Sequence, residues 1–297
     1  MNRFMIGQHV CFDDAKYARD FQKNFYGIEA CMFENESDID KLIAISKRDK
    51  LNIGIHFPLR SWAAKHRDPQ FLSKDDASRA AFFQHMEEEF EYLRRVKPKY
   101  VLFHYPKPVI LDDEVDWSPW RFSDSSEYVF ESAYSFEELR EKSEYLFEWL
   151  TDRAAKYDFV PVLELDALNK YIYETNFLEE LLDKYPKVKI CLDTGRFNFQ
   201  DRIDKNFDVL QVIEKFAKYA EIIHLCNTQV STRLDKHHYP ALPCLSPEEG
   251  WPPIEEYMKI INRQNKHAKI MFEHMSHLIS DEELQSCYDW ITGMITE

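Results

Sequence analysis

The stretch NFLEELLDKYPKVKICLDT, residues 176–194, contains the two patterns that decide the fold. In residues 176–185 the apolar side chains recur at the spacing of one helix face, which predicts an amphipathic helix. Residues 188–194 form a short and mostly apolar run, which is typical of a buried strand. Buried strands that alternate with helices indicate a parallel sheet whose faces are covered by those helices.

Strand-like runs of this kind recur eight times, at residues 4–10, 26–32, 51–57, 100–105, 159–165, 188–194, 220–226 and 268–274. Between them lie helical patterns at residues 80–96, 135–157, 176–185 and 207–219. Eight strand–helix units in a chain of 297 residues fit the size of a closed barrel. We therefore predict an α/β fold with a single (β/α)8 TIM barrel, and one domain over residues 1–297.

The rival α/β architecture is an open, doubly wound sheet. Such a sheet usually carries a glycine-rich phosphate-binding turn after its first strand. The whole chain has only 6 glycines, and the pattern G-x-G-x-x-G does not occur in it. The closed barrel is therefore the preferred prediction.

The composition predicts a protein with a sizeable core, because 44% of its residues are hydrophobic. We expect a cytoplasmic protein, since neither a membrane span nor a signal-peptide pattern is recognisable. The 6 cysteines are scattered singly, which indicates reduced thiols. A net charge of −15 opposes unspecific attraction to nucleic acid or anionic membranes, and it suits a protein that gathers divalent cations.

Side chains that can bind metal lie at or near the C-terminal ends of seven predicted strands: His9, His56, His104, Glu164, Asp193, His224 and Glu273. Each of them alone is more often a hydrogen-bonded structural residue. In a barrel, however, these strand ends meet at one mouth, where several carboxylates and imidazoles need a compensating cation. Imidazole with carboxylate predicts a divalent metal, with zinc as the first choice and manganese, cobalt or magnesium as alternatives.

Three segments are too long for simple connections: residues 60–76, 107–134 and 227–253. All three follow strands, so we expect them on the face of the barrel where active sites form. The last one contains RLDKHHYPAL, residues 233–242. In an extended loop Asp235 and His237 would point to the same side and reach the metal, whereas His238 would point away.

Five motifs resemble those of a known family: IGQHV, FHYP, CLDTGR, IHLCN and DKHH, which begin at residues 6, 103, 191, 223 and 235. With these motifs the chain resembles, over nearly its whole length, endonuclease IV, the zinc-dependent apurinic-site nuclease of the xylose-isomerase-like barrel superfamily. The resemblance implies a trinuclear metal site in which Glu164 bridges two ions. The implied ligands are His56, His104, Glu164, Asp193, His224, Asp235, His237 and Glu273.

The sequence departs from the family pattern at Arg196, where a histidine ligand is expected three residues after Asp193. A guanidinium stays protonated and cannot bind a metal ion. Arg196 would either replace the third ion and bind a phosphate oxygen, or belong to a site remodelled for a small phosphorylated or carboxylated substrate. We expect the substrate to contact His9, Arg196, Arg233 and Lys236.

Three functions follow as hypotheses. The first is an endonuclease IV-like hydrolase of abasic DNA or a related phosphate ester, in which Glu164 orients the attacking water. The alternative is a sugar or sugar-phosphate isomerase or epimerase. There, Glu164, Asp193, His224 and Glu273 would hold a single metal, and the two glutamates would move the proton. The third is a barrel that only binds a ligand. The histidines at 56 and 104 and the DKHH motif favour the hydrolase, whereas Arg196, the negative net charge and the long acidic segment 107–134 favour a small substrate.

Overall fold

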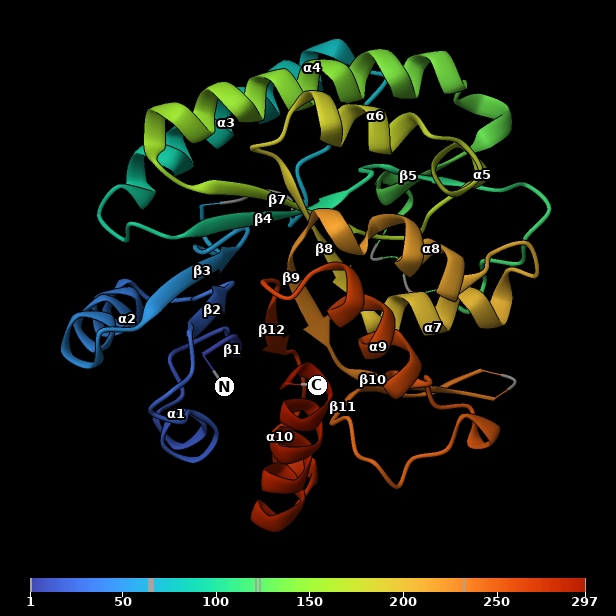
Figure 1. Cartoon of the computed structure of the whole chain (residues 1–297). Helices are drawn as coiled ribbons and strands as arrows, with labels where there is room; N and C mark the ends of the chain where they lie inside the picture. The colour runs from blue at the N-terminus through green and yellow to red at the C-terminus, as the bar shows by residue number, and fades with distance from the viewer. Residues whose placement is uncertain (1, 64–66, 121, 123, 232, 297) are drawn as a thin grey trace. The chain divides into compact units, whose positions relative to one another are not determined.

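The computed structural model describes residues 2–63, 67–120, 122, 124–231 and 233–296. Eight strands form a closed barrel in the order β1-β12-β9-β8-β7-β4-β3-β2 (Figure 1). Their bounds are β1 Phe4–His9, β2 Gly27–Cys31, β3 Asn52–His56, β4 Tyr100–Tyr105, β7 Val160–Leu165, β8 Lys189–Asp193, β9 Ala220–Leu225 and β12 Lys269–Phe272. Each strand lies in one of the predicted runs, so the prediction of a single (β/α)8 barrel is confirmed.

Helices follow or precede these strands as the periodicity predicts. Their bounds are α1 Asp14–Asp20, α2 Glu36–Asp49, α3 Asp76–Leu93, α4 Phe136–Tyr157, α5 Lys170–Tyr173, α6 Phe177–Lys184, α7 Thr194–Ile203, α8 Val209–Phe216, α9 Ile254–Gln264 and α10 Asp281–Thr296. Short 3-10 helices are η1 Ser125–Glu127, η2 Glu131–Ala133, η3 Ala217–Tyr219, η4 Pro247–Glu249 and η5 Ser276–Leu278. None of the helices in the described residues is both long enough and apolar enough to cross a membrane.

The long segments after strands are only partly irregular. Residues 107–134 contain a parallel pair, β5 (Val109–Leu111) and β6 (Tyr128–Phe130). Residues 227–253 contain an antiparallel hairpin of β10 (Asn227–Val230) and β11 (Leu234–Tyr239). The expectation of a loop at 233–242 is therefore wrong for most of that stretch, because β11 pairs with β10 there. In residues 60–76, the three residues 64–66 lie outside the described part of the chain.

The chain divides into two compact units. The terminal unit comprises Met1–Gln8, Asp13–Glu29 and Cys191–Glu297, and the central unit comprises His9–Phe12 and Ala30–Ile190. Strands β9 and β12 belong to the terminal unit, whereas β3, β4 and β7 belong to the central unit. The assignment of the whole chain to one domain stays a prediction.

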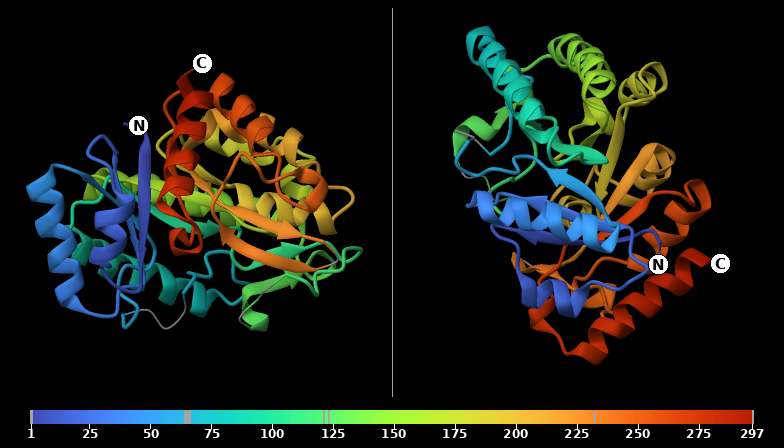
Figure 2. Two further views of the ribbon diagram at one scale, coloured as in Figure 1. Left: turned by 90° about the horizontal axis from the view of Figure 1, so that it is seen from below. Right: turned by 90° about the vertical axis from the view of Figure 1, so that its left-hand side faces the viewer.

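An aromatic cluster joins α10 to the strands of the terminal unit. Phe4 of β1 packs edge-on against Phe272 of β12, with ring centroids 4.9 Å apart. Tyr288 of α10 lies 4.7 Å from the ring of Phe272 and 6.4 Å from that of Phe4. Burial of such rings contributes strongly to the stability of the folded unit. It explains why α10 lies beside β1 (Figure 2).

In the central unit β4 lies between β3 and β7. The register pairs Gly54 with Tyr100 and His104 with Glu164. A β-carbon at position 54 would fall on the ring of Tyr100, which is buried. Glycine at this position therefore allows the Tyr100 ring to cross over β3.

We predict that Gly54→Ala lowers the free energy of unfolding by about 1–3 kcal/mol, because the added methyl overpacks the strand against Tyr100. Chemical denaturation measures the change. Gly293→Ala is the matched control, since no atom lies within 4 Å of a β-carbon there. Because alanine favours helices, that control should raise stability by about 0.5–1 kcal/mol. Equal effects of the two substitutions would contradict this account of Gly54.

Candidate metal-binding sites

Two histidines and a glutamate meet at the strand ends of the central unit. His56 ends β3, His104 lies on β4 and Glu164 lies on β7, and all three side chains are buried. One ligand atom from each lies within 4.8 Å of the other two. His56 Nε2 is 3.2 Å from His104 Nε2. Glu164 Oε2 is 3.4 Å from His104 Nε2 and 3.7 Å from His56 Nε2. The structure thus brings these three predicted residues together.

A buried carboxylate orients one of these histidines. Asp68 Oδ1 lies 2.8 Å from His104 Nδ1. Since a carboxylate accepts, Nδ1 carries the proton, and the lone pair of the neutral ring lies on Nε2, beside His56 and Glu164. This is the usual arrangement of a metal-binding histidine, whose second nitrogen donates to a carboxylate. The group of two imidazoles and a carboxylate therefore fits a divalent ion of the zinc type.

Asp68 also belongs to a buried ionic network. Lys107 Nζ lies 3.2 Å from Asp68 Oδ2 and 2.9 Å from Asp166 Oδ2, and all three side chains are buried. Burial alone would raise the pKa of the Asp68 carboxyl, but His104 and Lys107 lower it well below its usual range. The sequence analysis missed Asp68. The only signal was its position in the long segment after β3.

The terminal unit holds a second group of ligands. Asp193 ends β8, His224 lies on β9 and Glu273 follows β12, and their ligand atoms lie within 4.8 Å of one another. His224 Nδ1 is 3.2 Å from Glu273 Oε2, whereas its Nε2 is 3.1 Å from Glu29 Oε1. Glu29 is buried on β2 and was also missed, although an acidic residue inside an apolar strand was a visible signal. Two carboxylates therefore hold the His224 ring between them.

Asp193 begins helix α7 as its N-cap. Its Oδ1 accepts hydrogen bonds from the backbone N–H groups of Gly195, at 2.7 Å, and Arg196, at 2.9 Å. The guanidinium of Arg196 lies close to the same carboxylate, with Nε 3.6 Å from Asp193 Oδ2. Arg196 thus places a fixed positive charge beside a ligand of this group, and its side chain is 27% exposed.

A cysteine forms a further group with residues of the same unit. Cys226, His238 and Glu273 have ligand atoms within 4.8 Å of one another. The thiol of Cys226 is buried and donates to Asp193 Oδ1 at 3.7 Å. Burial raises the pKa of this thiol well above its usual range, and the negative charges of Asp193 and Glu273 add to the shift. Without a nearby cation, the thiol therefore stays protonated.

Other predicted residues lie outside these groups. Asp235 is exposed and accepts from the Ser231 N–H at 3.2 Å and from Arg233 Nε at 3.3 Å. His237 is exposed, and no ligand group of the described residues includes it or Asp235. Lys236 Nζ lies 4.8 Å above the ring of Tyr239. The proposed roles of these residues stay predictions.

The predicted roles of His9 and of Glu164 in a shared site are likewise untested. His9 ends β1 and is exposed. Glu164 belongs to the central unit, whereas Asp193, His224 and Glu273 belong to the terminal unit. A metal site that joins Glu164 to those three residues therefore stays a prediction, as do the predicted contacts of His9 and Arg233 with substrate.

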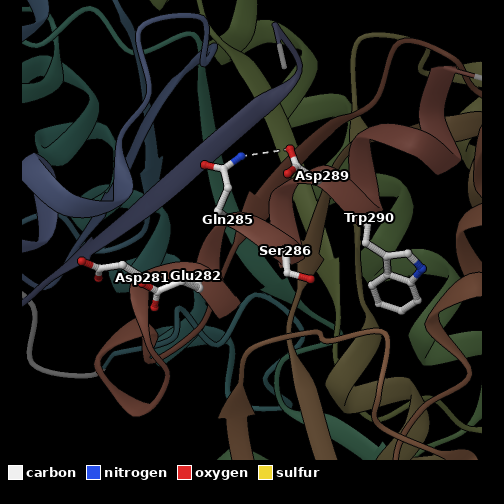
Figure 3. Close-up of a pocket in the computed structure, with 6 residues that line it drawn as sticks. All are labelled: Asp281, Glu282, Gln285, Ser286, Asp289 and Trp290. Carbon is white, nitrogen blue, oxygen red and sulfur yellow. Dashed lines mark hydrogen bonds between the residues drawn. The ribbon is translucent and has the colours of Figure 1, made fainter.

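A hollow on the outside of the terminal unit differs from these groups. Figure 3 shows its lining, which comes entirely from helix α10: Asp281, Glu282, Gln285, Ser286, Asp289 and Trp290. Gln285 Nε2 donates to Asp289 Oδ1 at 2.9 Å, as expected for residues four apart on one helix face. The lining contains neither histidine nor cysteine, so we assign it no chemistry.

The model of the xylose isomerase-like TIM barrel family matches residues 22–291. The chain belongs to this family. This assignment agrees with the closed barrel and with the ligand groups at its strand ends. No curated protein matches the chain.

Solved structures with the same fold differ in activity. A D-tagatose 3-epimerase-like protein has a TM-score of 0.63 and 14% sequence identity, with 99% of each chain covered. A 3-keto-D-glucoside 4-epimerase from E. coli has a TM-score of 0.58 and 13% identity, with 99% of each chain covered. A family 2 AP endonuclease from Brucella melitensis has a TM-score of 0.57 and 15% identity, again with 99% of each covered. At these identities the likeness shows the fold alone.

We predict that Asp68→Asn weakens zinc binding by about 10–100-fold, because the histidine at 104 loses the carboxylate that orients its ring. Competition with a chromogenic chelator measures the affinity. Asp113→Asn removes the same charge from an exposed carboxylate that bonds Ser132, and it should leave the affinity unchanged. An Asp68→Asn protein that is folded and binds zinc as tightly as wild type would show that Asp68 only stabilises the unit.

Proposed function

We propose that this protein is a divalent-metal-dependent hydrolase of the endonuclease IV type, which cleaves a phosphate ester. The observation that carries the proposal is the buried group of His56, His104 and Glu164 in the central unit. This group could bind one metal ion, in addition to an ion bound by the ligand group of the terminal unit. Two or more ions suit phosphate ester hydrolysis, because both the attacking and the leaving oxygen need stabilisation.

In a single-metal mechanism, His56 and His104 would not bind a metal ion. In that mechanism His56 and His104 would contact substrate. Yet Asp68 directs the lone pair of His104 Nε2 to the place where His56 Nε2 and Glu164 Oε2 also lie. Two acceptors, His104 Nε2 and Glu164 Oε2, converge at a buried point beside the ring of His56, and they favour a shared cation over a neutral hydroxyl group. The geometry of the central unit therefore supports the hydrolase better.

The residues of the chain have distinct roles under this proposal. A divalent ion, when bound, polarises the phosphoryl group and lowers the pKa of a water molecule. Glu164 orients the attacking water and accepts its proton. Arg196 binds a phosphate oxygen of the substrate through its guanidinium and so holds the ester in place. Asp68 positions His104, and Glu29 positions His224.

The substrate class is a phosphate ester, either in abasic DNA or in a smaller molecule. A net charge of −15 weakens the long-range attraction of a DNA duplex. The partly exposed guanidinium of Arg196 beside Asp193 offers one local positive charge that an anion could contact. An activity assay with an abasic duplex and with small phosphate mono- and diesters distinguishes a DNA substrate from a small-molecule substrate.

The second candidate is a sugar or sugar-phosphate epimerase or isomerase. It is favoured by the group of Asp193, His224 and Glu273, which is complete within the terminal unit and has Arg196 beside it. With Glu164, these residues would hold one ion, and the two glutamates would act as acid and base. Arg196 would then bind a phosphate or carboxylate of the sugar. Release of inorganic phosphate or of a cleaved strand supports the hydrolase, whereas interconversion of ketoses supports the epimerase.

We predict that His104→Ala lowers the metal content by about one ion per chain and lowers hydrolysis at least about 100-fold, because a ligand at the chemistry is lost. Elemental analysis and a phosphate-release assay measure the two effects, and circular dichroism monitors the fold. His267→Ala is the control, since His267 is exposed and lies outside the ligand groups. If His104→Ala stays folded and keeps all its metal, His104 is not a ligand and the proposal loses the observation that carries it.

We predict that Arg196→Ala weakens the binding of inorganic phosphate to the zinc-loaded protein by about 10–100-fold, because a charge-assisted contact contributes roughly 1.5–3 kcal/mol. Isothermal titration calorimetry measures the affinity. Arg202→Ala is the control, since Arg202 lies on the same helix and is bonded to the Pro247 carbonyl. Equal phosphate affinity in wild type and Arg196→Ala would remove Arg196 from the proposed binding site.

A further inference from the structure

The β10–β11 hairpin carries an irregularity at its two histidines. Asn227 pairs with Tyr239 and Gln229 pairs with Lys236, so two steps along β10 correspond to three steps along β11. The extra residue falls within His237–His238. Such a bulge interrupts the alternation of side chains and re-aims one of them. The simple alternation that directs His237 toward the metal and His238 away from it therefore fails at this point.

His238 is held in an uncommon conformation. Its φ is +47°, in the left-handed region that few bulky residues adopt. Its carbonyl accepts a hydrogen bond from the Met275 N–H at 2.8 Å, which helps to hold the backbone in this conformation. Its Nδ1 lies 3.2 Å from the carbonyl oxygen of Glu273. Because a carbonyl only accepts, Nδ1 carries the proton and Nε2 presents a lone pair.

Cys226 reaches the same place from the end of β9, where the chain continues directly into β10 (Figure 1). Its thiol is buried against the first turn of α7. Only glycine fits at position 195, because a β-carbon there would lie 2.7 Å from Cys226 Sγ. The sulfur is thus held at a fixed point. It lies within 4.8 Å of one possible ligand atom of His238 and one of Glu273.

We propose that Cys226, His238 and Glu273 form a metal site in the terminal unit, with the Cys226 thiolate as a ligand. Glu273 also belongs to the group with Asp193 and His224, and its carboxylate has two oxygens, so it can serve two ions. This goes beyond the proposed hydrolase, and it rests on it only in taking Glu273 as a metal ligand. Neither Cys226 nor His238 belongs to the ligand set that the endonuclease IV pattern implies.

The donor set selects the metal. Thiolate with imidazole and carboxylate favours zinc or cobalt over magnesium, which prefers oxygen ligands. On binding, the S–H bond of Cys226 breaks, the sulfur bonds the metal, and the proton leaves to solvent. The step needs no oxidant or reductant. The site therefore predicts a protein that takes zinc or cobalt at this position and does not accept magnesium there.

Cobalt(II) tests the site through its spectrum. Co²⁺ is added to the full-length protein after metal removal, and the near-ultraviolet absorption of a cobalt–thiolate bond is recorded. We expect this band in wild type and in Cys287→Ser, whose buried thiol lies on α10. Cys226→Ser should abolish the band while cobalt still binds the remaining sites, and Cys226→Ala serves if the serine variant does not fold. His238→Ala should weaken binding at least about ten-fold, and His237→Ala should not.

Three results would overturn the proposal. Cobalt that binds wild type without the thiolate band would exclude Cys226 and leave the proposed hydrolase intact. A band that persists in Cys226→Ser would assign another thiol. Loss of cobalt binding in His237→Ala but not in His238→Ala would show that His237 is the ligand, as the endonuclease IV pattern implies. If wild type binds no cobalt at all, this site and the proposed metal-dependent hydrolase both fail.

Discussion

The hydrogen bond between His104 Nδ1 and Asp68 Oδ1, 2.8 Å long, holds the candidate site of the central unit in order. Both side chains are buried, and so is Lys107, which neutralises Asp68 from its other oxygen. Removing one partner from such a buried pair costs about 3–5 kcal/mol, because the other charge is left unpaired. The contact that keeps Asp68 charged in the interior therefore also presents His104 Nε2 to Glu164.

The terminal unit repeats this principle with different partners. Glu29 meets one nitrogen of His224 and leaves the other beside Glu273. The carbonyl of Glu273 fixes His238 in the same way. In each case an oxygen lies beside one nitrogen of a histidine that belongs to a ligand group, an arrangement that is typical of metal-binding histidines. Three such histidines in one chain make a purely structural role for the set hard to sustain, and they favour a metal-dependent enzyme.

The barrel could be predicted well from the sequence, because each of its strands is indicated by a short run of consecutive residues. Each strand is a short apolar run, and residues such as His56 and His104 lie near the C-terminal ends of such runs, so their positions followed directly. Asp68 could not be found in this way. It lies in an irregular segment, where no periodicity indicates which side chain turns inward, and only the fold brings it to His104.

The loop at 233–242 shows a second limit. Alternation along an extended chain assigned His237 inward and His238 outward, and this depends on every residue keeping the strand period. The bulge in β11 adds one residue, and the positive φ of His238 turns its side chain toward Cys226 and Glu273. Neither feature has a glycine or proline signal in the sequence. The charged Glu29 inside an apolar strand, by contrast, was visible and could have been used.

The measurement that tests the central claim most directly is the metal content of the wild-type protein as purified, determined by elemental analysis against protein concentration. The ligand groups of the central unit and of the terminal unit predict at least two zinc-type ions per chain. A protein that is saturated by a single ion, and that takes up no more on dialysis against zinc, would contradict the account.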